Sequence, residues 1–237
     1  MPPNIVFIVG EPEYNSHISM PPVAEELQKK FGYETKVITS SIIPDEPDFL
    51  LSEFPGLEAL ADADLAVFFT RFRNISVEQF EIIKSYLESG RPVVGLRAAN
   101  HAFKFPDDSP LQSWNEGFGR SIFGTPWRMH YGHESSTDVR VIPEMANHQI
   151  LEGVENSFHV RSPLYYVMPL PGACKTLLEG TSIGPSDFEE RVDNPVAWTN
   201  VSNEARVFYT SMGHPEDFEN NSFKTLLFNG IQWALGK

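Results

Sequence analysis

Cysteine is almost absent from this chain of 237 residues, which contains only Cys174. A single cysteine cannot form an intramolecular disulfide, so a hydrophobic core must hold the fold together. A chain of this length can bury roughly three quarters of its unfolded surface, which makes a structural metal unnecessary. The lone thiol also fits a reducing compartment.

Long apolar runs and basic clusters are missing as well. No segment approaches the roughly 20 apolar residues of a membrane-spanning helix, and residues 1–4 lack the basic region of a signal peptide. The 18 Lys and Arg against 32 Asp and Glu leave a formal net charge of −14, whose average field repels polyanions. We therefore expect a cytoplasmic protein with a small-molecule ligand, and neither nucleic acid nor a membrane as partner.

Motifs for nucleotide binding are also absent. The chain has no G-x-G-x-x-G and no Walker A segment, and it lacks the H-E-x-x-H of zinc proteases. Nucleotide-dependent chemistry of the usual kinds is therefore unsupported.

Strand and helix patterns alternate along the first hundred residues. Strand patterns occupy residues 5–9, 34–39, 65–70 and 92–96. Helical patterns lie between them, at 22–31, at 56–61 and after a capping box of Ser76 and Gln79. This alternation predicts an α/β fold, a three-layer α/β/α sandwich with a mostly parallel sheet.

The middle of the chain is less regular, and clear signals return near its end. Short strands are expected at about 137–142, 164–168 and 175–180, and paired strands at 195–199 and 206–211. Residues 222–235 have the spacing of an amphipathic helix. No repeat or linker divides the chain, so we expect one domain over residues 1–237.

Ligands of such sheets bind beyond the carboxyl ends of the parallel strands. Residues 93–103 carry the best local signal there, because a buried strand runs through a sharp turn of small residues into a helix. Arg97 or Ala98 occupies this elbow, and neither is a thiol nucleophile. Asn100 and His101 follow as ligand-binding and catalytic candidates, although the small residues could serve tight packing alone.

A second signal follows the strand at 206–211. His214 and Glu216 have the spacing of a catalytic pair in which the carboxylate orients the imidazole base. The other interpretation is a turn that leads into the last helix.

The middle of the chain is rich in histidine. His130 and His133 are three residues apart and could bind zinc if His101, His17 or Glu134 supplied a third ligand. In the alternative interpretation these histidines and Tyr131 form hydrogen bonds or contact a substrate.

The loop after the first strand carries Glu11, Glu13, Tyr14 and His17. Two carboxylates could act as acid and base if their surroundings separate their pKa values. A solvated loop of an acidic protein is the alternative.

Arginine and aromatic side chains complete the candidates. Arg71 and Arg73 follow the third strand and suit an anionic or polyhydroxylated ligand, or an ion pair with Glu11 or Glu13. Trp198 could stack on a sugar or pack in the core.

Taken in order, these segments resemble the ThuA-like (trehalose-utilisation) family, a relative of the class I glutamine amidotransferases. The matching segments are the Glu-rich loop after the first strand and residues 68–73, 95–103, 130–133, 195–198 and 206–216. One departure is His148-Gln149-Ile150, where family members often have His-Pro-Ile. The resemblance implies an amidotransferase-like, flavodoxin-like fold without the nucleophilic cysteine, a role in carbohydrate catabolism beside dehydrogenases that make 3-keto sugars, and, in some members, a metal.

The residues and the resemblance together predict an enzyme that acts on a keto-disaccharide or glycoside by general acid–base chemistry. His101, His214 and one of Glu11 or Glu13 would transfer protons, and Arg71, Arg73 and Arg97 would orient hydroxyls or stabilise an enolate. A non-catalytic sugar-binding module is the alternative. A glutaminase would require Cys174 to reach the elbow. Zinc and a homo-oligomer stay open.

Overall fold

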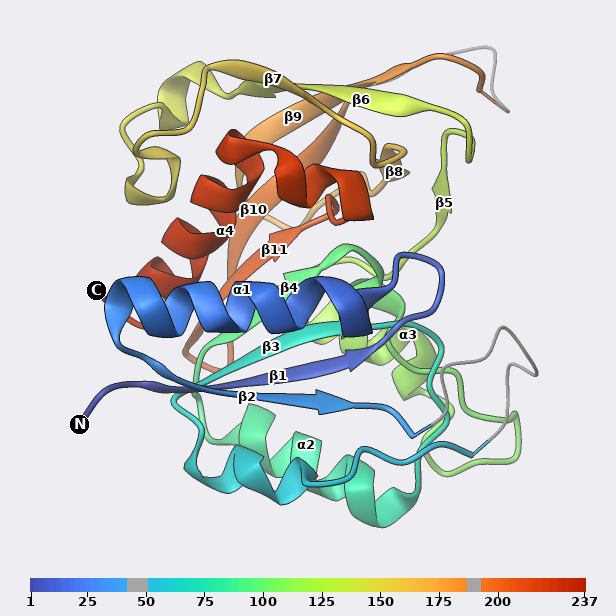
Figure 1. Ribbon diagram of the computed structural model, residues 1–237. Coiled ribbons are helices and arrows are strands. Elements are labelled where there is room, and N and C mark those ends of the chain that lie inside the picture. The colour runs from blue at the N-terminus through green and yellow to red at the C-terminus, as the bar shows by residue number, and fades with distance from the viewer. Residues whose placement is uncertain (42–50, 187–192) are drawn as a thin grey trace.

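A nine-stranded sheet in the order β2-β1-β3-β4-β11-β10-β9-β6-β7 forms the centre of the computed structural model, which describes residues 1–41, 51–186 and 193–237 (Figure 1). Its strands are β1 Asn4–Gly10, β2 Glu34–Thr39, β3 Leu65–Thr70, β4 Val93–Leu96, β6 Ser136–Val141, β7 Ser157–Val160, β9 Lys175–Ile183, β10 Asn194–Ser202 and β11 Ala205–Thr210. A separate two-stranded sheet pairs β5 Met129–His130 with β8 Tyr165–Tyr166.

The longer helices are α1 Ser16–Phe31, α2 Val77–Glu88 and α4 Asn221–Ala234. The short helical segments are η1 Leu57–Asp62, η2 Arg97–His101, α3 Trp114–Phe118, η3 Gly119–Phe123, η4 Pro143–Met145, η5 Gln149–Leu151 and η6 Pro215–Glu219. No helix in the part of the chain that the structure describes is long and apolar enough to cross a membrane.

The α/β prediction is confirmed, but the sheet is mixed. Strands β2, β1, β3, β4 and β11 pair in parallel, in the order of flavodoxin-like folds. The remaining pairs, from β11 through β10, β9 and β6 to β7, are antiparallel. The change from parallel to antiparallel pairing occurs between β11 and β10. Asn203 and Glu204, with φ values of 48° and 65°, form the two-residue hairpin turn that joins these strands.

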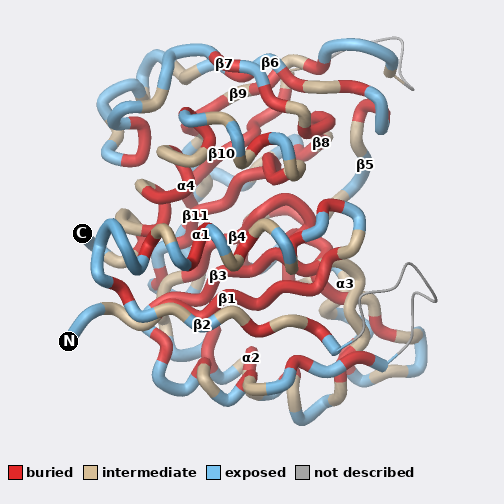
Figure 2. Tube along the Cα trace, in the orientation of Figure 1, coloured by how far each residue is buried: buried red, intermediate tan, exposed pale blue. Residues whose placement is uncertain are grey.

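Helices cover both faces of the sheet. Ile5, Phe7 and Val9 of β1 belong to one apolar cluster with α1 and α4, whereas Val6 and Ile8 belong to another with α2. This division follows the two-residue period of a strand, which points successive side chains to opposite faces. Figure 1 shows α1 and α4 on one side and α2 on the other, and Figure 2 shows the strands between them as the most buried part of the chain.

Helix α1 begins at Ser16, six residues before the predicted start at Pro22. The backbone N–H groups of Ile18 and Ser19 both donate to the carbonyl of Asn15, which closes a first turn ahead of Pro21 and Pro22. The two prolines therefore lie inside the helix, where each removes one backbone donor. As a consequence, His17 belongs to a helix and not to the loop after β1.

Candidate functional site

The loops that follow β1, β3 and β4 meet at the carboxyl edge of the parallel strands, at the right of Figure 1. The N–H of Arg71, after β3, donates to the carbonyl of Gly10 at the end of β1. The N–H of Phe72 donates to the carbonyl of His101, which follows β4. Backbone bonds thus hold three of the predicted loops together.

These loops, together with residues 127–133 and Tyr165, line a cavity of about 140 Å³. Its lining residues are Glu13, Tyr14, Arg71, Phe72, His101, Trp127, His130, His133 and Tyr165. A liquid water occupies roughly 30 Å³, so the space equals that of about five waters. It can hold a small ligand or one ring of a larger one.

His101 is 6% exposed and lies among the rings of Phe72, Trp127 and Tyr165, at centroid distances of 4.9, 5.2 and 6.1 Å. Burial lowers the pKa of its imidazole well below the ordinary value, and the positive charges of Arg71 and Arg97 lower it further. The ring is therefore neutral near pH 7. Its Nδ1 lies 2.7 Å from Oδ1 of Asn100. In the tautomer in which Nδ1 donates to this oxygen, Nε2 is the basic nitrogen.

Glu13 links two other cavity residues. One carboxylate oxygen lies 3.1 Å from Nε of Arg71, and the other lies 3.7 Å from Nδ1 of His133. The Glu13 and Arg71 side chains are 30% and 32% exposed, so water reaches the pair. The cavity thus has a charged rim beside the aromatic surroundings of His101, since the Arg71 guanidinium lies 4.7 Å from the centroid of the Phe72 ring.

Glu11 lies behind this rim and does not line the cavity. It is fully buried, and its Oε2 accepts the N–H of Tyr14 at 2.7 Å. Burial raises the pKa of its carboxyl group to about 7. Its Oε1 has no hydrogen-bond partner in the described part of the chain. Glu11 and Glu13 are therefore two carboxyl groups in different environments.

Arg97 occupies the predicted elbow with a left-handed backbone, φ 47°. Its side chain is fully buried and turns beneath the cavity. Its Nη1 donates to the carbonyls of Pro163 and Ser211, and its Nη2 donates to the hydroxyl of Tyr14 at 3.0 Å. The elbow thus presents a buried cation where an amidotransferase has its thiol.

His214 follows β11 as predicted, but it does not line the cavity. Its Nδ1 accepts the backbone N–H of Glu216, whose carboxylate is 4.0 Å away and largely exposed. The buried carboxylate of Asp217 holds the turn by accepting the N–H groups of Gly213 and His214. It also accepts the N–H of Arg161 and both the N–H and the hydroxyl of Ser162. This agrees with the alternative interpretation of the segment as a helix-entry turn, because His214 and Asp217 form a capping box at the start of η6.

The remaining sequence candidates lie around the cavity or away from it. Asn100 orients His101 from below, and Arg73 donates to the carbonyl of Arg71. Tyr131 is buried, and its hydroxyl accepts from Asn194. Trp198 is fully buried and donates to the carbonyl of Phe123, so it belongs to the core. His17 and Cys174 are not among the lining residues, and burial raises the pKa of the Cys174 thiol to about 11.

Two aromatic residues of the cavity, Phe72 and Trp127, carried no signal of their own in the sequence. Trp127 reaches the site because β5 pairs with β8, which also brings in Tyr165. Both residues lie close in sequence to predicted site residues, Phe72 next to Arg71 and Trp127 three residues before His130, and this proximity is the signal that could have identified them. Conversely, the sequence contains one G-x-S-x-G match, residues 180–184, but its buried Ser182 lies inside strand β9 and not at an elbow.

The predicted zinc ligands His130 and His133 do not form a metal site with the other residues that the structure describes. His130 and His133 have ring centroids 4.0 Å apart. Within residues 1–41, 51–186 and 193–237, however, no group of three or more His, Cys, Asp or Glu is placed to hold one. We therefore derive no step through a metal.

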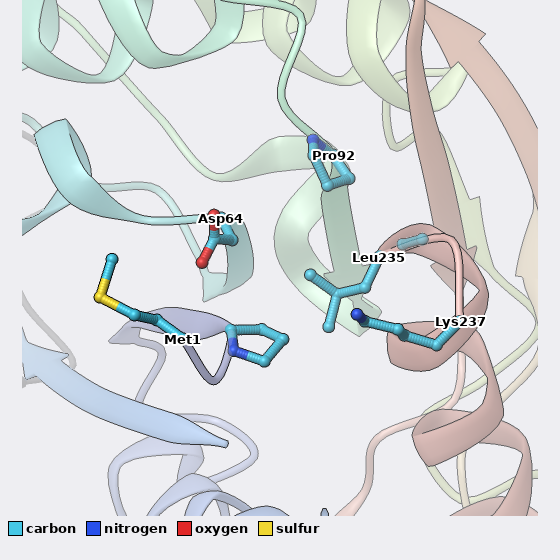
Figure 3. A pocket seen from close by; sticks show the side chains of 7 residues that line it. Met1, Asp64, Pro92, Leu235 and Lys237 are labelled. Carbon is cyan, nitrogen blue, oxygen red and sulfur yellow. The ribbon is translucent and has the colours of Figure 1, made fainter. Parts of the chain in front are cut away.

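A larger hollow of about 310 Å³ lies at the opposite end of the molecule (Figure 3). Met1, Pro3, Asp64, Pro92, Ala234, Leu235 and Lys237 line it. The Asp64 carboxylate accepts the N–H of Asn4, and the other lining side chains are mostly apolar. It faces the amino ends of the parallel strands, so we assign the chemistry to the smaller cavity.

Comparison with known proteins agrees with this fold. The sequence profile of the family ThuA, described as trehalose utilisation, matches residues 6–234. Among curated proteins, no sequence match was found.

Among solved structures, a ThuA-like protein from Parabacteroides merdae ATCC 43184 has a TM-score of 0.69 at 19% identity, covering 100% of this chain and 91% of that one. A cytoplasmic protein from Salmonella typhimurium LT2 has a TM-score of 0.57 at 11% identity, covering 98% and 99%. A β-galactosidase from Rahnella sp. R3 has a TM-score of 0.56 at 12% identity, covering 99% of this chain and 31% of that one. Such low identities show the fold alone.

Proposed function

The chain belongs to the ThuA family of trehalose utilisation, and from this premise we propose that it is an enzyme that moves protons on a keto-disaccharide or a glycoside. The cavity at the carboxyl edge of the parallel strands is the proposed active site. His101 is the proposed base, and no cofactor is part of the mechanism.

One observation carries this proposal: the buried imidazole of His101 lines the cavity with its Nδ1 against Asn100. Burial lowers the pKa of this imidazole, which favours its neutral form, and in the tautomer in which Nδ1 donates to Asn100, Nε2 is the basic nitrogen. A hydrogen on a carbon next to a ketone is acidic enough for such a base. A neutral imidazole accepts that proton without first losing its own.

The remaining cavity residues suit a sugar. Phe72 and Trp127 offer ring faces to the C–H groups of a sugar ring. The ion pair of Glu13 and Arg71 offers hydrogen-bond acceptors and donors to its hydroxyls. A cavity of about 140 Å³ accepts one ring, so the second ring of a disaccharide would extend past the half-exposed pair into solvent.

The test is a His101→Gln variant assayed on a 3-keto-disaccharide, with product analysis by NMR. Loss of a general base should lower kcat by about 100-fold or more. The matched control is His159→Gln, because His159 lies on β7, is half-exposed and pairs with Asp138 far from the cavity. Activity of His101→Gln equal to that of the control would refute the role of His101, and a His214→Gln variant would then test the other histidine.

A sugar-binding module without catalysis is the second candidate, favoured by the absence of a nucleophile at the elbow. Its signature is a thermal shift with a disaccharide but no product from any keto-sugar. Stabilisation and turnover together would exclude it.

A further inference from the structure

Arg97 is a buried cation that forms no ion pair in the described part of the chain, although the charge of Asp217 acts on it from a greater distance. It is fully buried, yet its side chain bonds only to two carbonyls and one phenol, and no carboxylate in the described part of the chain lies within ion-pair distance. A buried charge that lacks a counterion costs several kcal/mol, and the left-handed elbow adds backbone strain. Other contacts of the guanidinium group must offset these costs.

Its contacts are the rings of Tyr14 and Tyr165, both of which line the cavity. The guanidinium carbon lies 4.7 Å from the ring centroid of Tyr14 and 3.9 Å from that of Tyr165. The ring of His101 lies 6.1 Å from the ring of Tyr165, centroid to centroid. Arg97 and His101 are thus both neighbours of the Tyr165 ring.

The hydroxyl of Tyr14 is a hydrogen-bond donor that Arg97 holds in place. Arg97 Nη2 donates to this oxygen at 3.0 Å, so the phenol directs its own hydrogen elsewhere. Accepting a bond from a cation makes an O–H group a stronger donor. Burial raises the pKa of Tyr14, and the nearby Glu13 carboxylate, which the hydroxyl contacts, raises it further, so the phenol keeps its hydrogen in the neutral range. A ligand carbonyl would therefore take the place of Glu13 as the acceptor of this hydrogen.

We propose that Tyr14, positioned and polarised by Arg97, donates to the carbonyl oxygen of a keto-sugar and stabilises the oxyanion formed when His101 removes the neighbouring proton. This inference rests on the proposed function. In that step the proton moves from carbon to Nε2 of His101. The C–H electron pair forms a C=C bond, and the carbonyl π pair moves onto the oxygen that Tyr14 faces. His101 then returns the proton to the former carbonyl carbon, and the hydroxyl hydrogen of the neighbouring carbon passes to the oxyanion, so that the C=C electron pair forms the new C–H bond and the neighbouring carbon becomes the ketone.

The proposed step restricts the substrate class. An oxyanion forms only where the ligand has a carbonyl group, so the substrate is a ketone-bearing sugar and not a simple glycoside. Trehalose, which has no carbonyl, should bind without reacting. Tyr14 is then a catalytic residue, and Arg97, which does not line the cavity, is a positioning residue.

The experiment measures deuterium incorporation from D₂O into 3-ketotrehalose by NMR, corrected for exchange without protein. Tyr14→Phe removes only the hydroxyl and should lower kcat by about 100-fold, as expected for loss of one oxyanion donor, while KM changes less than about threefold. Tyr166→Phe is the matched control, because Tyr166 is the neighbour of Tyr165 in β8 but does not line the cavity. Arg97→Met should lower kcat, and the double variant should be no slower than the slower single variant, because the two residues act as one unit.

The outcomes separate this inference from the proposed function. If the wild type and Tyr14→Phe exchange deuterium equally fast, the role of Tyr14 is overturned while the proposed function stands. If the wild type itself exchanges none, both are overturned. Additive losses in the double variant would overturn the positioning role of Arg97. If Arg97→Met does not fold, Arg97→Lys takes its place in the cycle, and Tyr14→Phe alone decides the role of the phenol.

Discussion

Replacing Glu11 with Gln should change how the stability of the protein depends on pH. Glu11 is fully buried beneath the Tyr14 loop, and burial raises the pKa of its carboxyl group from 4.5 to about 7. Gln keeps the shape and an oxygen that can accept the Tyr14 N–H, but it cannot ionise. The substitution therefore removes one titration and leaves most contacts in place.

The sign follows from where the proton is bound more tightly. Between pH 4.5 and 7 the folded protein keeps the Glu11 proton while the unfolded chain has lost it, so the free energy of unfolding falls as pH rises through this window. The difference between 4.5 and about 7, at roughly 1.4 kcal/mol per pH unit, amounts to about 3 kcal/mol. The wild type should lose this stability by pH 8, and Glu11→Gln should not.

Urea unfolding at fixed ionic strength from pH 4.5 to 8.5 measures this difference. The curves of wild type and Glu11→Gln should diverge as pH rises, with the variant more stable by up to about 3 kcal/mol at pH 8 relative to pH 4.5. Glu25→Gln is the control, because Glu25 is exposed on α1 and pairs with Lys29. Parallel curves for wild type and Glu11→Gln would refute the assignment of a buried, proton-retaining carboxyl group.

Two further substitutions test the packing behind the site. Asp217→Asn should lower the free energy of unfolding by about 2 to 4 kcal/mol, because the new amide N–H₂ would face donors that now bond to a buried carboxylate. Glu219→Gln, on the exposed side of the same turn, is the control. Equal unfolding midpoints for the two variants would contradict this reasoning. Gly119→Ala should cost at least about 2 kcal/mol, because a Cβ there would lie 2.0 Å from the carbonyl oxygen of Asn100. Gly117→Ala, whose Cβ would meet only Trp114 at 3.9 Å, should be tolerated. Unchanged melting temperatures of both variants would show that the backbone at Asn100 can move to make room for the Cβ of residue 119.

The sequence predicted the parallel half of the fold well because its signals are local. Residues 34–39 and 65–70 coincide with β2 and β3, and Ser76 caps α2, where its hydroxyl accepts the N–H of Gln79. The Gln79 side chain bonds to the backbone of Phe54, so the second half of the predicted capping box does not form. The antiparallel extension was harder to predict. Its edge strand β7 is only four residues long, and its side chains alternate between buried and exposed within a segment of loop-like composition.

The candidate site was predictable as a set of loops but not as a set of contacts. The strand-end rule brought Glu13, Arg71 and His101 to one edge, and all three line the cavity. The same rule also selected Glu11 and His214, which the fold directs elsewhere. Glu11 turns inward to accept the N–H of Tyr14, and His214 turns its Nδ1 to the backbone of Glu216. Such side-chain directions depend on hydrogen bonds within each loop, and spacing along the chain does not encode them.

The elbow explains why the histidine after β11 lies outside the cavity. The Arg97 side chain passes beneath the cavity to the carbonyls of Pro163 and Ser211, and so it occupies the space between the elbow and the loop after β11. Gly213 leaves room for it, with φ 145° and a position where a Cβ would lie 3.2 Å from Cβ of Arg97. Tyr14, bonded to that cation, then lies between the cavity and His214, whose ring centroid is 6.2 Å from its own. The Arg97 side chain and Tyr14 thus keep His214 out of the cavity lining, whereas His101, four residues after Arg97, lines the cavity together with His130 and His133.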